Sequence, residues 1–113
     1  MDDYIRLINK TENFINSHLD KQIRIDDLSK NVNLSKFHFH RIFSKFSNET
    51  MKQFIVRTKM ERSAMFLAIR TDISMTEIAH RYGYSESSAY NRAFRKHFEM
   101  TPLEFRKARN VNT

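Results

Sequence analysis

Apolar residues recur at spacings of three and four along most of the chain, which is the period of an amphipathic α-helix. One series comprises Phe39, Ile42, Phe43 and Phe46. A second comprises Tyr90, Ala93 and Phe94, followed by His97 or Phe98. No segment alternates apolar and polar residues for long enough to be a strand. The pattern therefore predicts an all-α protein.

Seven helices are expected, and several have recognisable starts. Thr50-x-x-Gln53, Ser74-x-x-Glu77 and Thr101-Pro-x-Glu104 fit capping boxes, and Pro102 suits a first helical position. Ser35 and Ser85 are predicted N-caps. The predicted helices lie near residues 4–18, 26–32, 35–46, 51–70, 75–82, 86–98 and 102–109.

The chain also contains an internal repeat. Residues 28–54 can be aligned with residues 78–105, at an offset of 50 before a turn and 51 after it. Gly83, the only glycine, stands at the turn of the second copy, and Asn33 stands at the turn of the first. Both residue types tolerate the positive φ that ends a helix before a sharp reversal. The turns alone fit a helix-turn-helix and an ordinary αα-hairpin equally well.

The outward faces of the two second helices favour the helix-turn-helix. The positions left after subtracting the apolar faces are Phe37, His40, Arg41 and Ser44 in the first copy, and Ser88, Asn91, Arg92 and Arg95 in the second. Arg can contact guanine in the major groove, Asn suits adenine, and an exposed aromatic ring can contact a thymine methyl. The faces therefore predict the reading of DNA bases.

Composition narrows the class of partner. The 20 Lys and Arg residues against 13 Asp and Glu residues give a formal net charge of +7, which favours an anionic partner. Phosphate contacts are expected from Ser35, Lys36, Lys45, Ser85, Arg95, Lys96 and Arg106. The alternative is a sequence-tolerant architectural protein that binds DNA or RNA through charge alone.

Other classes of function are not expected. The chain has no Cys, and no paired carboxylates, Gly-rich phosphate loop or Ser-His-Asp arrangement points to an enzyme, a cofactor or a metal site. Its longest apolar run, residues 64–69, is far shorter than the roughly 20 residues that span a bilayer. We expect a cytoplasmic, nucleoid-associated protein without a membrane partner.

Several motifs resemble, in order and spacing, the AraC (arabinose-regulator) family of bacterial transcription regulators. They are residues 35–43 (SKFHFHRIF), 59–64 (KMERSA), 78–85 (IAHRYGYS), 92–98 (RAFRKHF) and 101–106 (TPLEFR). The resemblance implies that the base-reading positions are Phe37, His40 and Arg41 in the first unit and Ser87, Ser88, Asn91 and Arg92 in the second.

The resemblance further implies two helix-turn-helix subdomains, at residues 1–49 and 71–113, joined by a linker helix at 50–70. It implies a transcription regulator, most often an activator that recruits RNA polymerase, whose recognition helices enter adjacent major-groove segments of double-stranded DNA. The tandem units are expected to bind as a monomer, unless a domain outside this chain dimerises the protein.

Overall fold

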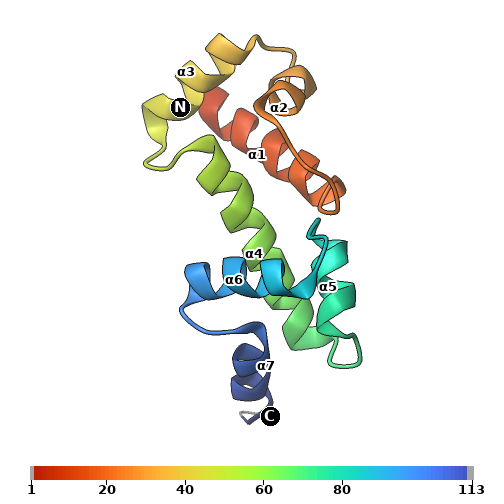
Figure 1. Cartoon of the computed structure of the whole chain (residues 1–113). Helices are drawn as coiled ribbons and strands as arrows, with labels where there is room; N and C mark the ends of the chain where they lie inside the picture. Colours follow the sequence, from red (N-terminus) through yellow and green to blue (C-terminus); the bar gives the residue numbers. More distant parts are fainter. Residues whose placement is uncertain (1, 112–113) are drawn as a thin grey trace. The chain divides into compact units, whose positions relative to one another are not determined.

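The fold is all-α, as predicted. A computed structural model describes residues 2–111, and within that range it contains seven α-helices and no strand (Figure 1). They are α1 (Asp2–Ser17), α2 (Ile25–Asn31), α3 (Lys36–Phe46), α4 (Met51–Ile69), α5 (Met75–Arg81), α6 (Ser87–Phe98) and α7 (Pro102–Val111). None of these helices is both long and apolar enough to cross a bilayer.

The chain folds as two compact units whose border lies within α4. The N-terminal unit extends to Thr58 and the C-terminal unit begins at Lys59. Residues 51–58 of α4 therefore belong to the N-terminal unit, and residues 59–69 belong to the C-terminal unit.

The N-terminal unit is built from α1, α2, α3 and the start of α4. Helix α1 packs against α2 and α3, and the core between them includes Leu7, Ile15, Leu28 and Phe39. Phe43 of α3 meets Phe54 of α4 edge to face, with ring centroids 5.6 Å apart. This packing holds α3 through one of its faces and leaves the other face to solvent.

The C-terminal unit is built from the second part of α4 together with α5, α6 and α7. Helix α6 packs against α5 and α7, and its Tyr90 and Phe94 are fully buried. The Tyr90 hydroxyl donates a 2.9 Å hydrogen bond to Ser63 Oγ of α4, and Ser63 is itself buried. Phe94 also contacts Phe105 of α7. Helix α6 is thus held through aromatic side chains on one face.

Most predicted helix starts are confirmed. Thr50 and Gln53 exchange two hydrogen bonds, as do Thr101 and Glu104. Ser74 Oγ accepts from the Glu77 amide at 3.1 Å. One apolar assignment is wrong in part, because Phe46 is 39% exposed at the end of α3, where its ring lies at a tilt against that of Tyr4.

Candidate nucleic-acid interface

Each unit contains the same sharp turn between two helices. Asn33 has φ of 58° and Gly83 has φ of 88°, so both predicted left-handed positions are confirmed. In the first turn, the Leu34 amide donates to Ser29 O at 2.9 Å and the Asn33 amide to Lys30 O at 3.0 Å. This pair of bonds is the Schellman motif that ends a helix.

The second turn repeats these bonds fifty residues later. The Tyr84 amide donates to Ala79 O at 2.9 Å and the Gly83 amide to His80 O at 3.1 Å. Beyond that point the turns differ by one residue. Ser35 caps α3 by accepting from the His38 amide at 3.1 Å, whereas the residue before α6 is Glu86, which makes no side-chain cap.

The prediction that Ser85 caps the second helix is therefore wrong. The extra residue of the second turn places Glu86, not Ser85, at the position that Ser35 occupies in the first. The Ser85 carbonyl instead lies 3.0 Å from His80 Nε2 of α5. This contact joins the end of the turn to the preceding helix.

Helix α3 presents a polar face with an exposed aromatic ring. Phe39 and Phe43 bury one side of the helix, so Phe37, His40 and Arg41 lie on the solvent side, with Phe37 74% exposed. Exposure of a phenyl ring to this extent leaves apolar surface available for contact with a partner. The three predicted base-reading residues of the first unit therefore share one accessible face.

Helix α6 presents the corresponding face of the second unit. Ser88 and Arg92 are exposed, whereas Ser87 and Asn91 are half-buried. Neither α3 nor α6 contains an acidic residue. Their outward faces therefore carry no carboxylate that would repel a polyanion.

Four cations flank these faces. Lys45, Arg95 and Lys96 are exposed. Lys36 is also exposed, and its Nζ lies 3.3 Å from Asp26 Oδ1 of α2. An exposed ion pair of this kind contributes about 0–1 kcal/mol, so a phosphate group can compete for the Lys36 side chain.

Two other residues predicted to contact phosphates, Arg106 and Ser35, make hydrogen bonds within the protein instead. Arg106 Nη2 donates to the backbone oxygens of Arg70 at 3.0 Å and Ile73 at 3.3 Å, which ties α7 to the end of α4. Ser35 Oγ is occupied by its cap. The structure therefore gives Arg106 a stabilising role that sequence spacing did not indicate, because its partners lie 33 and 36 residues away.

The hydrogen bond that joins Tyr90 of α6 to Ser63 of α4 was also not predicted from the sequence. Ser63 and Tyr90 are 27 residues apart, and a Ser in the middle of a helix carries no sign of a buried partner. The internal repeat could not reveal it either, because Ser63 lies outside both copies.

Comparisons with known proteins agree on one family. A family model described as "Helix-turn-helix domain" matches residues 28–108. The "Msm operon regulatory protein" of Streptococcus mutans is 33% identical over 88% of this chain, which spans only 36% of that protein. The "Probable transcription factor PqrA" of Proteus vulgaris is 34% identical, over 75% of this chain and 69% of its own length.

Solved structures share the fold. An AraC-type DNA-binding domain protein from Chromobacterium violaceum has a TM-score of 0.84 at 19% identity, over 96% of each chain. The DNA-binding domain of AdpA, solved in complex with a target DNA, has a TM-score of 0.73 at 22% identity, over 96% of this chain and 94% of its own.

Proposed function

The chain belongs to the AraC family of transcription regulators, and we propose that it binds a specific double-stranded DNA sequence with α3 and α6 as recognition helices. The observation that carries this proposal is the repetition itself. Both units have the same turn, and each then presents an exposed arginine, Arg41 or Arg92, on a helix free of acidic residues. A surface that bound DNA through charge alone would not require matched faces.

Direct base contacts are assigned by side-chain chemistry. Arg41 and Arg92 suit the O6 and N7 acceptors of guanine, and Asn91 suits adenine. The exposed Phe37 ring suits the methyl group of thymine. His40, Ser87 and Ser88 complete the two faces, while Lys36, Lys45, Arg95 and Lys96 bind phosphates and set the register.

We propose that the linker helix α4 sets the distance between α3 and α6 on the DNA. Helix α4 is continuous over 19 residues, which corresponds to about 28 Å. Neighbouring major-groove segments on one side of the duplex are about 34 Å apart. We propose that a monomer occupies two such segments, and that its site is asymmetric because the units repeat in tandem.

Selection of bound sequences from a random DNA pool tests specificity. We expect an asymmetric consensus with two conserved groups about ten base pairs apart. Recovery of unrelated sequences, with a specific-to-nonspecific affinity ratio near one, would instead identify a sequence-tolerant architectural protein.

Substitutions then separate base reading from phosphate binding. Arg41→Ala and Arg92→Ala are each expected to cost about 1–3 kcal/mol on the selected site and to relax the preference at one base pair. Lys96→Ala serves as the matched control, because it removes one exposed charge and should weaken all sequences equally. Unchanged affinity and preference in Arg41→Ala would remove α3 from direct readout.

The name of a relative favours activation of transcription over repression. The "Lactose operon transcription activator" of Staphylococcus xylosus is 28% identical over 88% of this chain. We propose that this protein likewise activates transcription, by recruiting RNA polymerase to DNA of the nucleoid. Reporter expression from a promoter carrying the selected site should rise with the protein and fall with Arg92→Ala; repression would reverse the assignment.

A further inference from the structure

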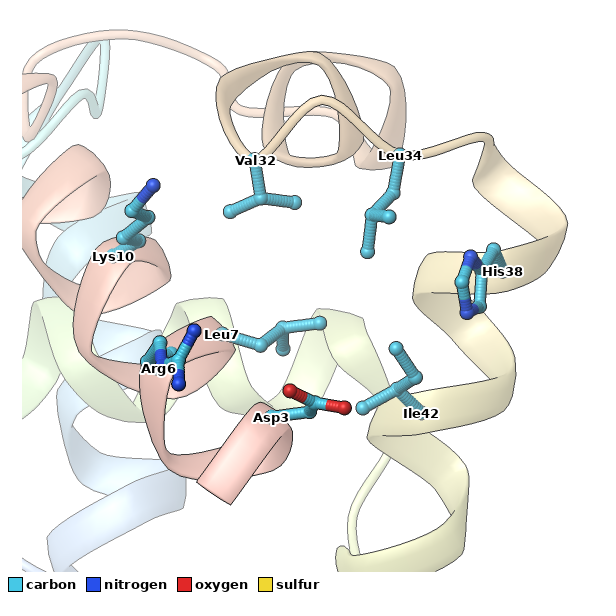
Figure 2. A pocket seen from close by; sticks show the side chains of 8 residues that line it. All are labelled: Asp3, Arg6, Leu7, Lys10, Val32, Leu34, His38 and Ile42. Atoms are coloured by element: carbon cyan, nitrogen blue, oxygen red, sulfur yellow. The ribbon is translucent and has the colours of Figure 1, made fainter. Parts of the chain in front are cut away.

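A groove opens on the N-terminal unit between α1, α3 and the turn that joins α2 to α3. Its volume is about 310 Å³. Figure 2 shows four apolar side chains pointing into this space from three different segments: Leu7, Val32, Leu34 and Ile42. Leu7 is buried, and the other three are half-buried. The groove therefore has an apolar lining supplied by the unit's own core residues.

Basic side chains line its edges. Arg6 and Lys10 stand one turn apart on α1, and His38 faces them from α3 (Figure 2). All three are exposed. Among the described residues, neither Arg6 nor Lys10 has an ion-pair partner. The one acidic residue, Asp3, lies toward the Ile42 end of the groove (Figure 2).

The size of the groove selects the class of occupant. Small-molecule sites have volumes of about 300–1,000 Å³, so this groove lies at the lower end of that range. A stable protein partner needs about 20–30 residues from each side, and eight residues line the groove. A small ligand therefore fits better than a folded partner.

We infer that this groove binds a small amphipathic carboxylate, whose apolar body packs on the leucine, valine and isoleucine side chains while its carboxylate is held by Arg6 and Lys10. Guanidinium and ammonium groups bind carboxylates through charge-assisted hydrogen bonds. A wholly polar anion would leave the apolar lining exposed to water, and an apolar cation would be repelled by both basic side chains. The inference goes beyond DNA binding, because Phe37 and Arg41 do not line the groove.

A titration of the whole chain with sodium octanoate, followed by ¹H–¹⁵N correlation NMR, tests the inference. We expect saturable shifts centred on the amides of Leu7, Lys10, Leu34 and Ile42, with a dissociation constant on the order of 1 mM for a ligand of this size. Octanol should bind more weakly and octylammonium more weakly still, whereas acetate should cause no saturable shift. Absence of saturation with octanoate, or shifts centred elsewhere, would overturn the site.

A pair of double variants tests the basic edge. Arg6→Ala/Lys10→Ala is expected to weaken octanoate binding by about 2- to 30-fold while leaving octanol binding unchanged. Lys30→Ala/Lys52→Ala is the control, because it removes the same charge from exposed positions outside the groove. Two results would show that Arg6 and Lys10 do not hold the ligand. One is a loss of octanoate affinity no greater than that of the control variant. The other is equal affinity of the unaltered chain for octanoate and octanol.

Discussion

At the scale of single residues, the buried hydrogen bond between Tyr90 and Ser63 gives the sharpest test of packing. Ser63→Ala leaves the Tyr90 hydroxyl buried without its acceptor, which should lower the free energy of unfolding by about 1–3 kcal/mol. Adding Tyr90→Phe removes the stranded group, so the double variant should be more stable than Ser63→Ala alone. Urea unfolding of the unaltered chain, Ser63→Ala, Tyr90→Phe and the double variant checks this order, and a double variant less stable than Ser63→Ala would contradict it.

The burial of the Tyr90 hydroxyl should also affect unfolding at alkaline pH. Burial raises the pKa of Tyr90 above its ordinary value of 10.0. The stability that Tyr90 contributes is therefore complete below pH 10 and declines at higher pH, because only the unfolded chain readily releases the proton. Tyr90→Phe should unfold with a weaker dependence on pH above 10 than the unaltered chain, which thermal unfolding at increasing pH would measure.

Substitutions of Gly83 test whether the turn before α6 is equivalent to the turn before α3. Its φ of 88° lies where a Cβ atom is unfavourable, so Gly83→Ala should cost about 1–2 kcal/mol. Gly83→Asn copies the residue that adopts φ of 58° at the first turn and should cost less. Equal losses in thermal unfolding of the two variants would mean that the second turn does not tolerate the residue used by the first.

At the scale of helices, local signals explain why so much could be predicted. The seven segments follow from apolar spacing and from capping residues three positions apart, and such signals need no knowledge of the fold. Ser85 failed as a cap because a one-residue difference between the turns shifts the helix start, and element boundaries depend on such details. The hydrogen bonds that join Arg106 to Arg70 and Tyr90 to Ser63 could not be predicted, because they connect residues far apart in sequence.

Helix α7 offers a test of one of these local signals. The Thr101 hydroxyl accepts from the Glu104 amide at 3.1 Å, and Glu104 accepts from the Thr101 amide at 2.9 Å. Thr101→Ala removes the first bond and should cost about 0.5–2 kcal/mol, in keeping with other N-caps. Thr101→Ser, which keeps the hydroxyl, is the control. Thermal unfolding in which Ala and Ser behave alike would show that the cap does not stabilise α7.

At the scale of the whole molecule, the division of α4 between two cores determines how the chain can be tested. Met51 and Phe54 are buried in the N-terminal unit, and Met60 and Leu67 are buried in the C-terminal unit. An insertion between Thr58 and Lys59 keeps each residue with its own core. The folding of the units and their joint action on DNA can therefore be separated experimentally.

One alanine inserted at that border should uncouple the two recognition helices. It turns the C-terminal unit by about 100° and moves it about 1.5 Å along the helix, which should prevent α3 and α6 from entering neighbouring grooves together, as we propose they do. We expect affinity for the full site to fall by about 100-fold or more, as the avidity of two linked contacts is lost. Affinity for a DNA carrying only one half of the site should stay the same, which controls for folding. A footprint that still covers both halves, at unchanged affinity, would show that α4 does not act as a rigid spacer.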